Sequence, residues 1–134
     1  MKKLLLILIC LFMSFEVKSN DHLKFIKELE DLKWYLYEDR IQRSGNIINF
    51  STLYERESTG TFKSKGITYQ FLSYRVNEQM DCLRTKVRPL KIIYYEFKMG
   101  KGKIIYETGK EMSNMKWESE TPSLFLLDHL CKNY

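Results

Sequence analysis

Two cysteines are the residues whose chemistry the sequence indicates most directly. The chain has three cysteines, but Cys10 lies in an apolar segment that we expect to be removed during export. An even number of cysteines in an exported protein predicts a disulfide, and Cys82 with Cys131 is then the one pairing available. It would close a loop of about 50 residues, worth about 4 kcal/mol in the chain-entropy treatment. Free reactive thiols, the alternative, would need a histidine partner or a Cys-x-x-Cys spacing, and neither is visible.

Catalytic and metal-binding chemistry have little support in the sequence. Candidate metal ligands are His22, His129, the cysteines and scattered carboxylates, which lack the close spacing of zinc sites. There is no Gly-x-Ser-x-Gly motif for a nucleophilic serine. Nothing among the acidic residues selects the facing pair that a glycosidase needs. We therefore expect no enzymatic activity, no metal and no other cofactor.

Basic residues form the surface feature that predicts binding. Arg84, Lys86 and Arg88 alternate along one face of an expected strand, and Lys91 lies just beyond them. Such a row can engage sulfated glycans, acidic proteins or anionic lipid head groups. It can equally be the solvated side of a sheet, or positive charge that protects a sheet edge. Both interpretations stay open at this point.

Aromatic residues are the second candidate for binding. The chain has nine tyrosines and two tryptophans, more than a core of this size needs. Tyrosine and tryptophan are favoured at interfaces. We therefore expect exposed aromatic side chains to serve partner binding or a homodimer.

The domain that carries these residues follows a leader. Met1-Lys2-Lys3 is a short basic segment, Leu4–Met13 is apolar throughout, and Val17-Lys18-Ser19 fits a cleavage site. This pattern predicts a cleaved signal peptide over residues 1–19, since the apolar run is shorter than the about 20 residues that span a bilayer. A retained N-terminal anchor is the alternative. Cys10 follows Ile9, where lipoprotein processing needs a small residue, so no lipid anchor is indicated.

Residues 20–134 are then expected to form one domain, with no second apolar run of membrane length. The leader carries three lysines and one glutamate, so removing it lowers the formal net charge of +5 to +3. A mildly basic exported domain can attract acidic surfaces weakly. Its charge is too low for a dedicated nucleic-acid binder, and we expect no nucleic-acid partner.

The element pattern is mainly β. Aromatic and β-branched residues dominate from Trp34 onward, with turns expected at Arg43–Asn46 and Met99–Lys103. Before them, Asn20–Leu32 has an apolar residue at every third position, which favours a short amphipathic helix or a frayed lead-in. We expect Glu57–Gly66 to be a loop and Asn77–Met80 a polar connector. The expected strands are Ile47–Arg56, Ile67–Val76, Leu83–Arg88, Leu90–Lys98 and Ile104–Thr108.

A helix is expected at the C-terminus. Thr121-Pro122 has the residue types of an N-cap and a first helical position, and Ser123–Lys132 carries a broad apolar stripe. The resulting fold class is α+β, mainly β. We expect a single antiparallel sheet of five or six strands, with the C-terminal helix packed on it and tied to it by the disulfide.

Several features follow one another in a set order: Trp34, the strand Ile47–Arg56, Asp81-Cys82, the strand from Arg88-Pro89-Leu90 to Tyr95, the glycines Gly100 and Gly102, then Trp117, Thr121-Pro122-Ser123 and Cys131. In this order they resemble the surface-adhesin protein E family of Gram-negative bacteria. The resemblance covers nearly all of residues 20–134. It implies a signal peptide, a small antiparallel sheet with a disulfide-tethered C-terminal helix, and a dimer.

The family resemblance also implies a function. It implies an exported adhesin that binds host matrix or serum proteins such as vitronectin, laminin and plasminogen, at the outer cell surface or in the periplasm. The alternative is a periplasmic enzyme inhibitor or envelope stress protein, with Glu57–Gly66 or Gly109–Met115 as its exposed loop.

Overall fold

The computed structural model describes residues 22–109, 117 and 123–134. The leader and the expected N-cap at Thr121 lie outside these residues. Within these residues, seven strands and one α-helix follow one another, with two short 3-10 turns, η1 and η2. Their bounds are β1 (Leu23–Leu29), β2 (Leu32–Tyr37), η1 (Glu38–Arg40), β3 (Gln42–Ser44), β4 (Ile47–Ser64), β5 (Ile67–Asp81), β6 (Lys86–Tyr95), η2 (Lys98–Gly100), β7 (Ile104–Glu107) and α2 (Ser123–Asn133).

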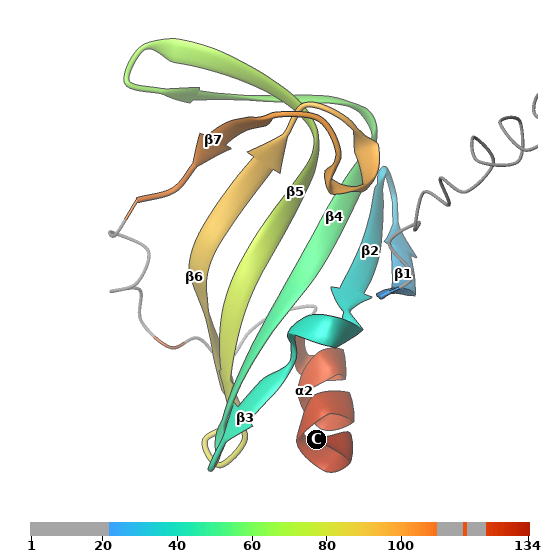
Figure 1. The fold of residues 1–134 in the computed structure, drawn as a ribbon, viewed down its shortest axis with the longest axis vertical. Coiled ribbons are helices and arrows are strands. Elements are labelled where there is room, and N and C mark those ends of the chain that lie inside the picture. The colour runs from blue at the N-terminus through green and yellow to red at the C-terminus, as the bar shows by residue number, and fades with distance from the viewer. Residues whose placement is uncertain (1–21, 110–116, 118–122) are drawn as a thin grey trace, which may run out of the picture.

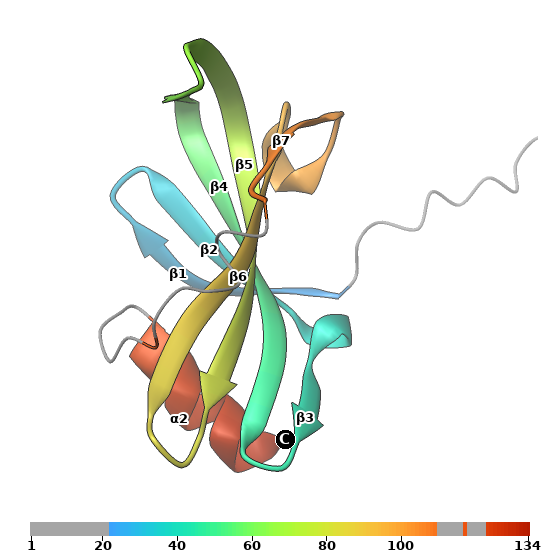
Figure 2. The same ribbon diagram turned by 90° about the vertical axis from the view of Figure 1, so that its left-hand side faces the viewer.

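The strands form one antiparallel sheet with α2 packed on one of its faces (Figures 1 and 2). Their order across the sheet is β1-β2-β4-β5-β6-β7, and β3 pairs with β4 beside this path. We call the side on which α2 lies the helix face. The mainly β class and the C-terminal helix are as predicted. The expected number of five or six strands is wrong, because the described residues form a sheet of seven.

One additional strand lies where we expected a helix or a frayed lead-in. β1 pairs with β2 through a turn at Glu30 and Asp31, with Glu30 at a φ of 37°. A bulge between Phe25 and Lys27 inserts Ile26 as an extra residue, and Ile26 packs against the core. A bulge breaks the two-residue alternation of a strand, which is why the apolar spacing resembled that of a helix.

The expected loop at Glu57–Gly66 is also wrong, because β4 continues to Ser64. Pairing with β5 is lost between Glu55 and Gly60 at a bulge, and resumes from Gly60 to Ser64. The turn itself is confined to Lys65 and Gly66, with φ values of 50° and 78°. Two positive φ values are typical of the tight turns that join antiparallel strands. Strands β4 and β5 therefore extend as a long hairpin beyond their neighbours (Figure 1).

The expected connector Asn77–Met80 is part of β5. Its polar side chains pair across the strands: Ser51 Oγ donates to Asn77 Oδ1 at 2.9 Å, and Gln79 Nε2 donates to Asn49 Oδ1 at 3.0 Å. Cross-strand partners of this kind stabilise a sheet. Asn77 and Gln79 therefore belong to one polar face of β5 and do not mark a break in the strand.

A turn replaces the first half of the strand expected at Leu83–Arg88. Residues 82–85 form the turn, and β6 begins at Lys86. Asp81 Oδ1 accepts hydrogen bonds from the backbone N–H groups of Leu83 and Arg84, at 3.0 and 3.1 Å. An aspartate that accepts from residues two and three positions later stabilises a turn. Pro89 lies beside a bulge in β6, one of the positions expected for it.

The main core lies between the sheet and α2. It consists of Trp34, Leu36, Ile48, Phe50, Met80, Val87, Leu126 and Leu130. The predicted disulfide is present beside it, with Cys82 Sγ and Cys131 Sγ 2.03 Å apart. Fully burying one large apolar side chain contributes about 1.5–3 kcal/mol, so packing and disulfide together fix α2 on the sheet.

Candidate binding surface

A row of aromatic residues crosses the helix face of the sheet. Each of five adjacent strands contributes one ring, and the rings stand directly opposite one another in the strand pairing. The row runs Trp34 (β2), Tyr54 (β4), Tyr74 (β5), Tyr94 (β6) and Tyr106 (β7). We call these residues the aromatic row.

The rings of the aromatic row touch from one strand to the next. The centroids of Trp34 and Tyr54 are 5.9 Å apart, and those of Tyr54 and Tyr74 are 4.9 Å apart, with interplanar angles of 16° and 11°. Tyr94 lies 5.6 Å from Tyr74 and 6.2 Å from Tyr106 in more tilted arrangements. Such pairs contribute about 0.5–1.5 kcal/mol beyond the area they bury. The four tyrosines of the row are half-buried and form a preformed, rigid surface, whereas Trp34 is buried.

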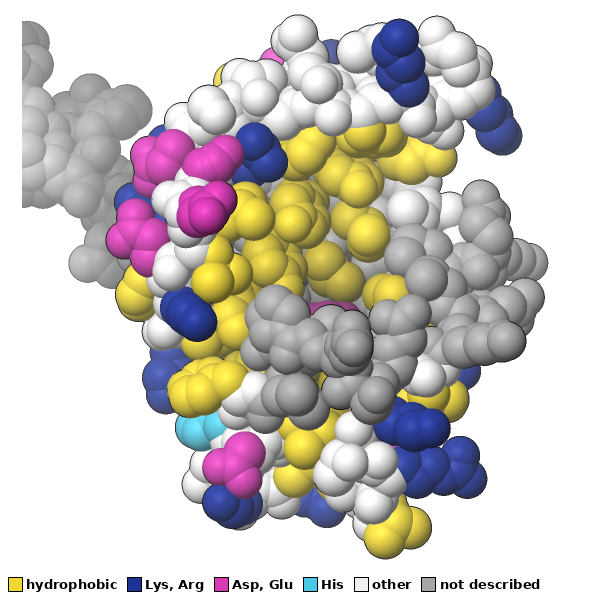
Figure 3. Space-filling view, turned by 180° about the vertical axis from the view of Figure 1, so that it is seen from behind, with side chains coloured by type: hydrophobic (Ala, Val, Ile, Leu, Met, Phe, Trp, Pro, Cys, Tyr) yellow, Lys and Arg dark blue, Asp and Glu magenta, His cyan; other side chains and the backbone are white. Residues whose placement is uncertain are grey.

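The β4–β5 hairpin adds three more rings. Phe62 lies 4.4 Å from the Tyr94 ring, Phe71 lies 4.9 Å from the same ring, and Tyr69 lies 5.0 Å from Tyr106. Together with the aromatic row, we call these eight residues the aromatic face. Figure 3 shows hydrophobic side chains gathered between the overhanging hairpin and α2.

The hydroxyl groups of Tyr54, Tyr74 and Tyr94 stay protonated. Burial, with a smaller contribution from the neighbouring Tyr94, raises the pKa of Tyr74 to about 12. Burial, with a smaller contribution from the Glu78 carboxylate, also raises the pKa of Tyr54. Burial and then Tyr106 raise that of Tyr94. These phenols therefore remain neutral hydrogen-bond donors and acceptors at physiological pH.

A buried polar pair separates the tyrosines of the aromatic row from the core beneath α2, to which Trp34 also belongs. Glu78 is 8% exposed, and Thr52 Oγ1 donates to its Oε2 at 3.1 Å. Both residues lie on the helix face, between these tyrosines and the core. The helix face therefore has two parts, an aromatic part beneath the hairpin and an apolar core beneath α2.

The basic residues singled out from the sequence do not form one continuous strand face. Arg84 lies in the turn before β6, with its Nε 3.7 Å from Asp81 Oδ2. In the strand pairing, Lys86, Arg88 and Lys91 lie opposite Asp81, Gln79 and Asn77, on the side of the sheet away from the aromatic row. The expectation of a single alternating row fails at Arg84, because the turn interrupts the strand there.

Two of these basic side chains have further partners. Arg88 donates from Nε and Nη2 to Gln79 Oε1 at 3.0 and 2.6 Å, and its guanidinium lies 4.5 Å from the Trp117 ring centroid. Lys91 Nζ lies 3.2 Å from Glu107 Oε2. Their positive charge is thus partly engaged within the molecule.

The aromatic row was missed from the sequence, although its signal was partly visible. The number of tyrosines predicted interfacial aromatics. The turns and bulges set the register of the strand pairs, and this register aligns the five rings. A one-residue slip would move a strand's rings to the opposite face.

Within residues 22–109, 117 and 123–134, no group of three histidine, cysteine or acidic side chains could hold a metal ion. No helix in the same part of the chain is long and apolar enough to cross a membrane.

Comparison with known proteins agrees with the fold. Residues 25–132 match the family described as surface-adhesin protein E. A solved structure of Haemophilus influenzae protein E is similar, with 16% sequence identity, a TM-score of 0.60 and coverage of 89% of each chain. Crystal form II of that protein gives 14% identity and a TM-score of 0.62, covering 87% of this chain and 92% of that one. No curated protein matches the sequence.

Proposed function

The chain belongs to the surface-adhesin protein E family, and from this premise we propose that it is an exported, non-enzymatic adhesin whose aromatic face binds a protein partner. Residues 1–19 serve as the cleaved signal peptide and residues 20–134 as the adhesin domain. The partners are host matrix or serum proteins of the class of vitronectin, laminin and plasminogen, bound at the outer cell surface.

The aromatic face is the observation that carries this proposal. Tyrosine and tryptophan dominate the residues that contribute most to protein–protein affinity. They do so because a large ring with a polar end offers contact area at a low cost in side-chain entropy. Here the rings already hold one another in place, so little ordering is needed on binding.

The tyrosine hydroxyls supply the polar part of the interface. Because burial keeps Tyr54, Tyr74 and Tyr94 protonated, each can donate to a carbonyl or carboxylate of a partner. A surface of this kind binds through apolar contact, with a few oriented hydrogen bonds, rather than through charge. The basic residues on the other side of the sheet are a separate and secondary candidate surface.

The proposal is tested with Tyr94→Ala, in the middle of the aromatic face. Binding to immobilised vitronectin, laminin and plasminogen is measured by surface plasmon resonance. For the partner that binds, we expect about a thirtyfold loss of affinity, the size typical of a central interface residue. Tyr35→Ala is the matched control, since Tyr35 pairs with Leu53 on the opposite face and should leave affinity unchanged. Equal effects of the two variants would contradict the proposal.

A second copy of the chain could cover the aromatic face in place of a host protein, which would make the protein a homodimer. Sedimentation of the exported protein separates the two, because a dimer that Tyr94→Ala dissociates would mean that a second copy covers this face. Fractionation of cells tests the location. Recovery in the soluble periplasmic fraction alone would contradict adhesion.

The alternative function, a periplasmic enzyme inhibitor, required an exposed loop, and the first candidate for that loop is a strand in the structure. Glu57–Gly66 was its first candidate, but residues up to Ser64 belong to β4. The second candidate, Gly109–Met115, lies outside the described residues except for Gly109. No observation in the described part of the chain favours inhibition.

A further inference from the structure

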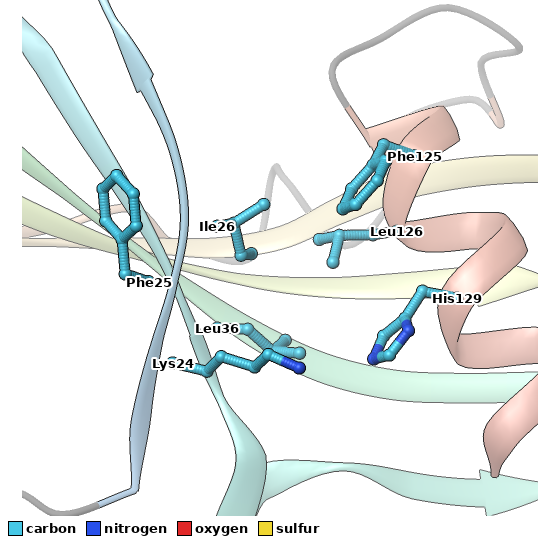
Figure 4. Close-up of a pocket in the computed structure, with 7 residues that line it drawn as sticks. All are labelled: Lys24, Phe25, Ile26, Leu36, Phe125, Leu126 and His129. Carbon is cyan, nitrogen blue, oxygen red and sulfur yellow. The ribbon is translucent and has the colours of Figure 1, made fainter.

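A groove lies between the edge strand β1 and α2, and it meets the aromatic face at Trp34. A cavity of about 200 Å³ has walls of Ile26, Leu36, Phe125 and Leu126, with Lys24 and His129 also lining it (Figure 4). A second cavity of about 160 Å³ shares Ile26 and Phe125 and adds Lys27 and Trp34. We call the two together the β1–α2 groove. Their combined size is at the lower end of the range of small-molecule sites, about 300–1,000 Å³.

The local sequence explains why the groove is open. The bulge in β1 turns Ile26 toward the core, and Phe125 on the first turns of α2 faces it across the gap. Phe125 is 66% exposed. A large apolar ring left in water beside an apolar cavity loses the free energy that burial would provide. A ligand that covers Phe125 would recover it.

The polar groups of the groove are hydrogen-bond donors. Asn133 Nδ2 lies 3.2 Å from His129 Nδ1 and donates to the His129 carbonyl at 2.7 Å. Because the Asn133 amide nitrogen can only donate, His129 Nδ1 accepts, and Nε2 of the neutral ring carries the hydrogen. Lys24 has no ion-pair partner among the described residues. An ammonium and an imidazole N–H beside one apolar cavity are complementary to a carboxylate.

We propose that the β1–α2 groove binds a linear fatty-acid anion. Its carboxylate lies between Lys24 and His129, and its acyl chain runs past Ile26 and Phe125 toward Trp34. This inference does not rest on the proposed adhesion, for which the half-buried tyrosines of the aromatic face provide the contact surface.

The chemistry of the walls favours an acyl chain over a peptide. The walls are aliphatic and aromatic, and a peptide backbone buried against them would leave amide groups without hydrogen-bond partners, at a large cost. An acyl chain has no such groups. A diacyl phospholipid would need room for a second chain, whereas the two cavities are small and lie on either side of the same two residues, Ile26 and Phe125.

The orientation of the ligand is testable through Trp34. The chain has two tryptophans, so Trp117→Phe leaves Trp34 as the only one. The exported protein carrying this substitution is titrated with 12-bromododecanoate and with 2-bromododecanoate, below their micelle concentrations, while tryptophan fluorescence is recorded. Bromine quenches an indole that it touches. We expect strong quenching by the terminal bromine and little by bromine beside the carboxylate. No saturable quenching by either probe, or equal quenching by both, would overturn the proposal.

The head group is tested by charge. Lys24→Glu should weaken dodecanoate binding by about tenfold or more, the scale of a lost charge-assisted contact. Lys63→Glu makes the same change of charge on the exposed part of β4 and should leave affinity unchanged. Dodecan-1-ol, which has the chain without the charge, should bind at least about tenfold more weakly than dodecanoate. Equal affinities of the two lysine variants, or of acid and alcohol, would overturn carboxylate recognition.

Discussion

Gly60 lies where the long β4–β5 hairpin bends, and adding one methyl group there should destabilise the protein. A Cβ at this position would lie 2.5 Å from Phe71 Cζ, and 2.9 Å from both Phe71 Cε1 and Arg56 Cδ. Arg56 can move, but Phe71 is 8% exposed and its ring contacts Tyr74 and Tyr94 at 5.8 and 4.9 Å. Overpacking of a well-packed site costs about 1–3 kcal/mol. We expect Gly60→Ala to lower the free energy of unfolding by about 2 kcal/mol.

The measurement is urea unfolding followed by circular dichroism, with the midpoint falling and the slope unchanged. Phe71→Leu removes the two ring atoms that the methyl group would meet. The loss of unfolding free energy in the double variant should therefore be smaller than the sum of the losses in the two single variants, by about 1 kcal/mol or more. Thr61→Ala, at an exposed neighbour, is the control and should change little. An unaltered midpoint for Gly60→Ala, or strict additivity with Phe71→Leu, would refute this account of the contact.

Two further predictions concern titration and charge. The pKa of Tyr74 is raised by burial to about 12, so its stabilising effect is complete below the unfolded value of about 10 and is lost as pH rises toward 12; Tyr74→Phe should remove about 2 kcal/mol of the loss of stability measured by urea unfolding between pH 10 and 12, and an identical pH profile for the variant would contradict this. Replacing both Lys86 and Arg88 by glutamate should lower the salt concentration that elutes the protein from a heparin column, if the basic residues bind anions; unchanged elution relative to the wild type would exclude that role, and Lys63→Glu with Lys65→Glu controls for net charge.

Local pattern predicted the parts of the fold that depend on local chemistry. Alternating residues marked the central parts of β4 and β5, and the apolar stripe marked α2. The pairing of Cys82 with Cys131 followed from cysteine number and export. These features need no knowledge of which strands are neighbours.

Features that depend on pairing could not be predicted in this way. From the sequence alone, Asn77 and Gln79 are typical of a connector, because their hydrogen-bond partners on β4 cannot be identified. The spacing of Ile26 is typical of a helix, because the bulge in β1 cannot be identified either. Asp81 converts the start of an apparent strand into a turn by accepting two backbone hydrogen bonds. The candidate site has the same origin, because the aromatic row exists only when five strands are in one register.

The disulfide has a consequence for survival outside the cell. It joins Cys82, just before β6, to Cys131 in α2, with 49 residues of separation. Any single peptide-bond cleavage between these two cysteines opens a ring but releases no fragment. A nicked molecule would therefore keep its terminal helix covalently attached beside the core, and two separate pieces would form only after reduction. For a protein exposed to proteases, this covalent ring is a form of damage tolerance.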